Sequence, residues 1–176
     1  MGYRLPAALA ATVARHAAPD DGPLLDAGCG TGAQAEPLAL LGYRPFVGLD
    51  PSERMLAIAY GKGIYTALHR GPLGPDLDPT PLGAPGGFAV AIACGCLTPG
   101  HAPPEGLDGL ARAVRAGGLV ALTLRDDAAM DPAYASRAVA LEREGRWHRL
   151  HRSAPFRGMP YGEPSMTHRV YAFRVL

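Results

Sequence analysis

The chain has 176 residues, a hydrophobic fraction of 48% and a formal net charge of +1. This length is typical of one domain that buries its own core. The near-neutral charge argues against a nucleic-acid partner, because nucleic-acid-binding domains are usually strongly basic. The longest apolar run, residues 88–97, is too short to span a bilayer, so no membrane partner is expected. The composition leaves the oligomeric state open.

Cysteine and lysine usage indicate where the protein works. The three cysteines, at positions 29, 94 and 96, lack the regular spacing of a disulfide framework. Free thiols favour a reducing compartment, and the first residues lack the pattern of an export signal, so we expect a cytoplasmic protein. Lys62 is the only lysine beside many arginines. Together with abundant Ala, Gly and Pro, this favours a GC-rich bacterial genome.

The amino-terminal half alternates helices with short strands. Apolar residues at helical spacing predict a first helix over residues 5–16, and residues 24–27 predict a strand that runs into a glycine-rich turn. A helix, a strand, a third helix and a weak strand follow, over residues 33–41, 45–49, 52–60 and 64–69. Ser52 begins the third helix, at a position where serine is a favoured N-cap.

The carboxy-terminal half begins with a Pro- and Gly-rich segment, residues 71–87, which predicts a long loop. The apolar run over residues 88–93 predicts a strand buried on both faces. After a loop we expect a helix over residues 107–114, capped by Gly117 and Gly118. A strand, a helix and a terminal antiparallel strand pair complete the chain, over residues 119–124, 131–144, 147–153 and 168–175. This alternation predicts an α/β protein with a doubly wound, mostly parallel seven-stranded sheet.

Ligands of such sheets bind at the carboxyl ends of the strands. We therefore expect five places to converge: Asp26 with the glycine turn that follows it, Asp50, and residues 71–73, 94–97 and 125–127. Glycines on alternate positions let the backbone of that turn approach a ligand closely.

Asp26 indicates which nucleotide binds. The G-x-G-x-x-A pattern over residues 28–33 is also compatible with a dinucleotide, and Asp50 suits a ribose in either case. Dinucleotide-binding turns usually carry an apolar residue at the position of Asp26. A carboxylate there favours a cationic amino-acid head and repels a pyrophosphate.

Three motifs resemble those of class I S-adenosylmethionine-dependent methyltransferases. They are DAGCGTG over residues 26–32, GLDPSERMLAIA over residues 48–59 and RAGGLV over residues 115–120. Ala116 stands where the family often has proline. Four further segments are similar to methyltransferase-like proteins of the Williams–Beuren-region type: KGIY at 62–65, TPGH at 98–101, TLRDD at 123–127 and YAFRV at 171–175. The resemblance implies a Rossmann-like methyltransferase fold.

The resemblance also implies S-adenosyl-L-methionine as the cofactor and methyl transfer to a small-molecule substrate. Asp26 would help to hold the methionyl ammonium, Asp50 would accept hydrogen bonds from the ribose hydroxyls, and Pro51 and Met55 would wall the adenine. Leu73 would offer its backbone N–H to the adenine ring. The implied cofactor-binding residues are Asp26, Ala27, Gly28, Gly30, Gly32, Asp50, Pro51, Met55, Pro72, Leu73, Cys94 and Leu97.

His101, in the loop after the fourth strand, is the candidate catalytic residue. A histidine that is neutral at working pH can act as a base or orient the acceptor, although a solvated loop residue is the alternative interpretation. Asp126 and Asp127 are weaker candidates. Cys94 and Cys96 near His101 lack a second pair of ligands at metal-binding spacing, so no metal is expected.

Two departures from the family pattern keep other hypotheses open. Pro72 stands about where many members carry an Asp for the adenine amino group, with Asp76 or Asp78 as possible substitutes. Relatives also carry a lid helix before the segment that corresponds to residues 3–6, where this chain starts, so residues 1–176 are predicted to form a single domain without that helix. The alternatives are a methyltransferase-fold binding module or pseudoenzyme with weak or no cofactor binding, and an NAD-dependent oxidoreductase.

Overall fold

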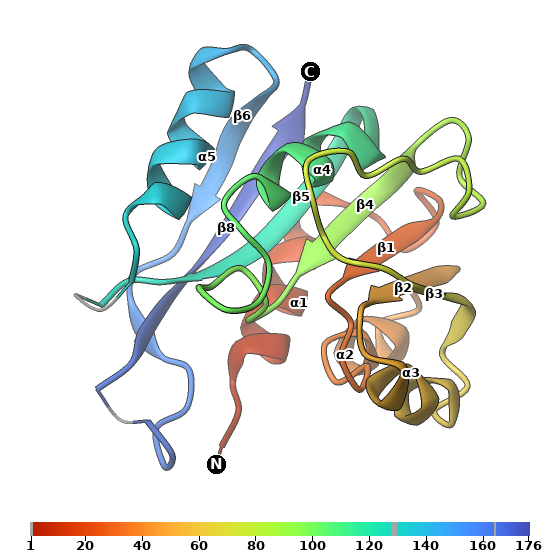
Figure 1. The fold of residues 1–176 in the computed structure, drawn as a ribbon, viewed down its shortest axis with the longest axis horizontal. Helices are drawn as coiled ribbons and strands as arrows, with labels where there is room; N and C mark the ends of the chain where they lie inside the picture. The colour runs from red at the N-terminus through yellow and green to blue at the C-terminus, as the bar shows by residue number, and fades with distance from the viewer. Residues whose placement is uncertain (1, 128–129, 164) are drawn as a thin grey trace.

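One mixed sheet runs through this computed structural model, which describes residues 2–127, 130–163 and 165–176 (Figure 1). Its strands are β1 (Leu24–Ala27), β2 (Phe46–Asp50), β3 (Tyr65–Arg70), β4 (Phe88–Ala93), β5 (Val114–Arg125), β6 (Trp147–Arg152), β7 (Phe156–Arg157) and β8 (Thr167–Val175). The strand order is β3-β2-β1-β4-β5-β8-β6, and the short β7 pairs with β8. The first five strands are parallel, whereas β8 is antiparallel to both β5 and β6. The predicted fold class is confirmed, with β7 as an addition.

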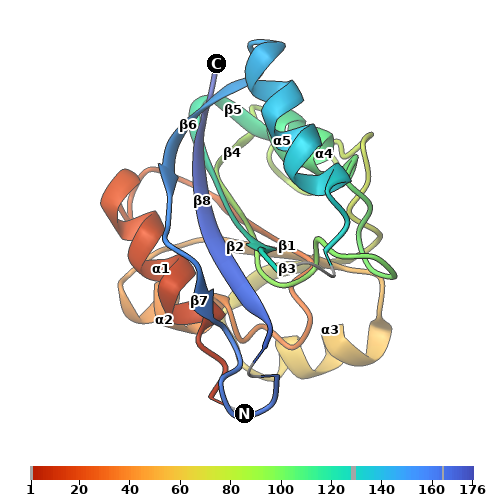
Figure 2. The same cartoon turned by 90° about the vertical axis from the view of Figure 1, so that its left-hand side faces the viewer.

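Helices cover both faces of this sheet. They are α1 (Leu5–His16), α2 (Ala35–Leu40), α3 (Glu53–Tyr60), α4 (Gly106–Ala113) and α5 (Ala133–Arg143). Figure 2 shows α1 and α2 on one side of the sheet and α4 and α5 on the other. Each side has its own hydrophobic cluster. Successive side chains of the central strands point to opposite faces, so each strand contributes residues to both clusters. Among the described residues, no helix combines the length and apolar character needed to cross a membrane.

The loop over residues 71–87 replaces a helix between β3 and β4. Proline and glycine prevent a regular helix there, but Leu73, Leu82 and Ala84 are still buried in the cluster that α4 completes. The loop passes very close to α4, where a Cβ atom on Gly109 would overlap with the carbonyl oxygen of Gly74. A glycine at position 109 therefore lets this loop pack directly against the helix.

The expected helix cap at Gly117 and Gly118 is wrong. α4 ends at Ala113, and Val114 is already extended, so β5 begins directly after the helix. The strand pairing shifts between Phe88 and Val90, and Gly117 has a φ of +76°. The two glycines thus form a bulge inside the strand, because glycine adopts positive φ without strain.

The carboxy-terminal strands close the sheet around an aromatic stack. Trp147 on β6 is fully buried, its ring lies 4.3 Å from that of Phe173 on β8, and its Nε1 donates a hydrogen bond to the Ala138 carbonyl of α5. This side chain therefore belongs to the core, where it joins α5 to the antiparallel edge.

Candidate active site

The glycine turn after β1 has the geometry of a ligand-binding loop. Gly28, Gly30 and Gly32 all have positive φ, at 71°, 52° and 81°. A Cβ on Gly28 would lie 2.6 Å from Cys96 Cβ, and one on Gly32 would lie 2.9 Å from the Tyr65 ring, whereas one on Gly30 would meet nothing within 4 Å. The outer glycines thus pack against protein, and Gly30 leaves its side of the turn open to a ligand.

Asp50 at the end of β2 is joined directly to this turn. Its Oδ2 accepts a hydrogen bond of 2.9 Å from the Gly30 N–H, and its Oδ1 accepts one of 2.9 Å from the Ser52 N–H. A carboxylate has about four lone-pair sites, so two bonds leave capacity for two hydroxyl donors. The Ser52 hydroxyl in turn accepts from the Met55 N–H, as predicted for an N-cap.

Asp26 is completely buried and is held by two side chains. Its Oδ2 accepts a hydrogen bond of 2.6 Å from the Tyr65 hydroxyl, and its Oδ1 accepts one of 3.0 Å from Gln34 Nε2. Gln34 Nε2 also donates to the Gly28 carbonyl. The Tyr65 ring reaches Asp26 from β3 by passing over Gly48 of β2, where a Cβ would lie 3.1 Å from the ring. These contacts give Asp26 a role in holding the turn, beside the predicted role toward an ammonium.

Neither side-chain partner of Asp26 was predicted from the sequence. Gln34 lies within the residues of the predicted second helix, and Tyr65 lies on a strand that is not adjacent to β1. The only sequence signal was Gly48, a glycine in the middle of a buried strand, which often marks a close approach by another group.

Burial raises the pKa of Asp26 to about 7, against the hydrogen bonds from Tyr65 and Gln34, which lower it, and with a further increase from the charge of Asp50. The folded protein therefore keeps a proton on Asp26 between about pH 4 and pH 7, where the unfolded chain has lost it. Stability contributed by this group falls as pH rises through that window.

We expect the Asp26→Asn variant to lack this pH dependence. A pKa change from 3.8 to about 7 corresponds to at most about 4 kcal/mol of free energy. Between pH 4 and pH 8 the free energy of unfolding of the wild type should therefore fall by on the order of 2–4 kcal/mol more than that of the variant. Urea unfolding at both pH values measures this difference. The exposed Asp20→Asn variant is the control, and parallel pH profiles for wild type and Asp26→Asn would show that Asp26 keeps an ordinary pKa.

The adenine end of the predicted site is the most open part. Pro51, Met55 and Pro72 are exposed, whereas the Leu73 side chain is buried in the core. The two suggested substitutes for the missing Asp have other partners. Asp76 pairs with Arg112 of α4, and Asp78 accepts from the Thr80 N–H.

The segment after β4 lies beside the glycine turn and β5. Cys96 Sγ donates to the Ala27 carbonyl at 3.3 Å, and the Gly95 N–H donates to Thr123 Oγ1 at 2.9 Å. Cys94 and Leu97 are buried in the two hydrophobic clusters of the core. The Tyr3 hydroxyl lies 3.9 Å from Cys94 Sγ. Tyr3 thus brings the amino-terminal segment to this site, which sequence analysis did not predict.

The thiols here are protonated. Burial raises the pKa of Cys94 to about 12 and shifts the pKa of Cys96 in the same direction. Within the described ranges no group of three or more His, Cys, Asp or Glu residues could hold a metal ion.

A cavity of about 430 Å³ opens at the carboxyl ends of β4 and β5. His101 is exposed and lines it, which places the predicted catalytic residue at a cavity beside the turn. His168 on β8 also lines it and is only 4% exposed. It was missed because it lies outside the YAFRV segment of its strand. Asp126 and Asp127 do not line this cavity. They line a smaller one of about 200 Å³ on the side of α5.

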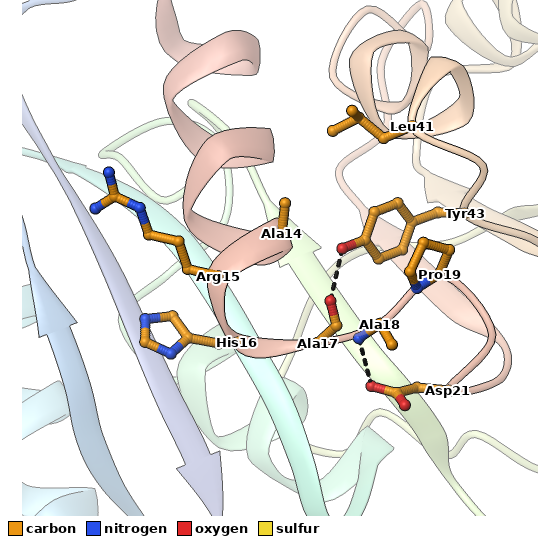
Figure 3. Close-up of a pocket in the computed structure, with 9 residues that line it drawn as sticks. All are labelled: Ala14, Arg15, His16, Ala17, Ala18, Pro19, Asp21, Leu41 and Tyr43. Carbon is orange, nitrogen blue, oxygen red and sulfur yellow. Dashed lines mark hydrogen bonds between the residues drawn. The ribbon is translucent and has the colours of Figure 1, made fainter.

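A hollow at the opposite edge of the sheet holds none of the predicted site residues. It lies where the loops before β1 and β2 meet, between the end of α1 and Tyr43 (Figure 3). There the Tyr43 hydroxyl donates to the Ala17 carbonyl, and the Ala18 N–H donates to Asp21. The predicted site residues therefore gather at the carboxyl edge.

The family model of the methyltransferase domain matches residues 1–171. This chain belongs to the methyltransferase domain family. No curated protein matches the chain in sequence. The fold agrees with the family, and the structural similarity of this methyltransferase domain to solved structures extends over nearly the whole chain.

Three solved structures illustrate that similarity. The magnesium protoporphyrin IX methyltransferase of Synechocystis PCC 6803, with bound SAH, has a TM-score of 0.74 at 15% identity and covers 99% of this chain and 83% of its own. The N-methyltransferase NodS of Bradyrhizobium japonicum WM9 has a TM-score of 0.72 at 14% identity over 98% and 94%. A TehB-like SAM-dependent methyltransferase of Corynebacterium glutamicum has a TM-score of 0.67 at 20% identity over 96% and 88%.

Membership of the methyltransferase domain family implies S-adenosylmethionine as the cofactor. Residues at the carboxyl edge fit it, because Gly30 leaves the turn open and the Asp50 carboxylate beside it retains acceptor capacity. Neither the oxidoreductase nor the pseudoenzyme alternative is favoured by the family or by the structural comparisons.

Proposed function

We propose that this chain transfers a methyl group from S-adenosylmethionine to a small-molecule acceptor that binds in the cavity lined by His101. One observation carries the proposal. The Asp50 carboxylate accepts a hydrogen bond from Gly30 of the open glycine turn, and the same edge of the sheet holds a cavity large enough for a small molecule. S-adenosylmethionine supplies an electrophilic methyl group on a sulfonium. The protein then has to position an acceptor, which provides much of the catalysis in a displacement reaction.

Each predicted residue has a place in this proposal. Asp50 holds the ribose hydroxyls, the turn at Gly30 lies against the cofactor backbone, and Asp26 fixes that turn through Gln34 and Tyr65. The adenine is bordered by Pro51, Met55, Pro72 and Leu73. The floor of the pocket is formed by Ala27, Gly28, Gly32, Cys94 and Leu97. His101, at the cavity, orients the acceptor or takes its proton.

The finer assignments rest on the sequence. The segments KGIY, TPGH, TLRDD and YAFRV support the Williams–Beuren-region type within the family. Free cysteines and the abundance of Gly and Pro support a cytoplasmic bacterial protein. The net charge of +1 and the short apolar runs support the absence of nucleic-acid and membrane partners.

Titration calorimetry of the full chain with S-adenosylmethionine, S-adenosylhomocysteine and NAD tests the proposal. We expect saturable heat with the first two ligands and none with NAD, because the chain belongs to the methyltransferase domain family. Heat with NAD alone would favour the oxidoreductase. No heat with any of the three ligands would favour the pseudoenzyme.

A further inference from the structure

The imidazole of His168 is a buried polar group that the proposed function does not use. The side chain is 4% exposed and stands opposite Arg125 in the antiparallel pairing of β5 with β8. Its Nδ1 has no hydrogen-bond partner within the described part of the chain. Buried polar groups are nearly always paired, and the same ring also lines the cavity.

Gly158 lies directly against this ring. A Cβ at position 158 would lie 2.7 Å from His168 Nδ1 and 2.7 Å from a Leu5 methyl group, so the glycine makes room for the imidazole. Nδ1 lies on the side of Gly158, which does not line the cavity, whereas Nε2 is not among the buried unpaired atoms of the described residues, so Nε2 is the nitrogen that can reach a ligand. A buried unpaired N–H is rarer than a buried unpaired acceptor. The proton therefore belongs on Nε2, where it can donate into the cavity.

The charges around the cavity are balanced. Arg125 is the one lining side chain among the described residues with a full charge at neutral pH, and it forms hydrogen bonds of 3.0 Å and 2.7 Å to Asp127. Arg169, next to His168 in the chain, pairs with Asp126 at 2.7 Å. Burial and the charge of Arg125 lower the pKa of His168, with a smaller opposite contribution from Asp127, so the ring is neutral at pH 7.

The rest of the lining is mainly apolar. Leu5, Leu97, Pro99, Met159 and Met166 contribute hydrocarbon and thioether surface. A carboxylate or ammonium ligand would lose its hydration there without gaining an unpaired opposite charge. A neutral, largely apolar molecule would not incur that cost.

We propose that this cavity binds a neutral, largely apolar acceptor that carries a hydroxyl group, and that His168 Nε2–H donates a hydrogen bond to that hydroxyl oxygen. The inference rests on the proposed function, because it names the substrate class of the same site. Methionine side chains adapt to ligands of different shapes, so Met159 and Met166 set the approximate size of the acceptor.

The test uses 13C-methyl-methionine-labelled full-length protein with saturating S-adenosylhomocysteine. Three probes with the same naphthalene ring are titrated: 2-naphthol, the anion 2-naphthoate and the cation 2-naphthylmethylammonium. We expect 2-naphthol to shift the methyl signals of Met159 and Met166 saturably and to bind at least tenfold more tightly than either charged probe. The Met55 signal, on α3, is the internal control. Equal or tighter binding of a charged probe, or shifts confined to other methionines, would overturn the proposal.

Variants then isolate His168. His168→Phe keeps a ring of similar shape but cannot donate, so 2-naphthol should bind at least fivefold more weakly, while His168→Gln, which retains an N–H donor, should bind within threefold of wild type. His148→Phe, at an exposed position of β6, is the matched control and should change nothing. A twofold or smaller effect of His168→Phe would remove His168 from the site. The affinity for S-adenosylhomocysteine is measured for the wild type and for every variant. If the wild type does not bind S-adenosylhomocysteine, the proposed function is contradicted, whereas the acceptor class is judged only from the naphthalene probes.

Discussion

Asp50→Ala should weaken S-adenosylhomocysteine binding at least thirtyfold. The Asp50 carboxylate supports the site in two ways: it accepts from the Gly30 N–H of the turn and from the Ser52 N–H at the start of α3, and we propose that it also accepts from the ribose hydroxyls. The substitution leaves two N–H groups without their acceptor and removes the charged partner of the ligand. Hydrogen bonds to a charged group contribute about 1.5–3 kcal/mol each, and 2 kcal/mol already corresponds to roughly thirtyfold in affinity.

Calorimetry measures this loss, and Glu53→Ala provides the comparison. Glu53 is an acidic residue only three positions away, but its side chain is 83% exposed and makes only a long ion pair with Arg70, so its removal should leave affinity within twofold. Thermal unfolding of both variants separates lost contacts from lost folding. If Asp50→Ala binds S-adenosylhomocysteine within threefold of wild type while folded, Asp50 does not hold the ribose.

Gly109→Ala should destabilise the fold, although alanine favours a helix over glycine by about 1 kcal/mol. A Cβ at this position of α4 would overlap with the Gly74 carbonyl oxygen and lie 3.0 Å from Leu77 Cβ. Backbone atoms cannot rotate away, so the loop over residues 71–87 has to move off the helix. Overpacking of this kind costs about 1–3 kcal/mol. Because the contact is with backbone, we expect a cost in the upper part of that range, which is larger than the gain in helix propensity. Urea unfolding should show a net loss of about 1–2 kcal/mol.

The same loop offers a matched control for Gly109→Ala. A Cβ on Gly86 would meet nothing within 4 Å, so Gly86→Ala should change the free energy of unfolding by no more than about 0.5 kcal/mol. Because Leu73 precedes Gly74, Gly109→Ala should also weaken S-adenosylhomocysteine binding if Leu73 borders the adenine. Unchanged stability of Gly109→Ala would mean that the loop relaxes away from α4 without losing its buried leucines.

Local patterns were sufficient to predict most elements of the fold. The helix over residues 5–16 and the strand over residues 24–27 begin and end as predicted, because apolar spacing and the flanking Pro and Gly residues act within a few positions of each other. The boundary between α4 and β5 was wrong, because two consecutive glycines mark a helix end and a strand bulge equally well. Only the pairing of Val114 with Phe88 and of Leu119 with Val90 distinguishes them.

The sequence by itself determined the methyltransferase motifs and the edge of the sheet at which they meet, since consecutive β/α units place strand ends on one side. Only the tertiary structure decided what surrounds those motifs. It brought Tyr65 across Gly48 to Asp26, Tyr3 to Cys94, and His168 into the cavity beside His101. These contacts join residues far apart in the chain, and such pairings depend on strand order and on the space left by particular glycines, which no local pattern records.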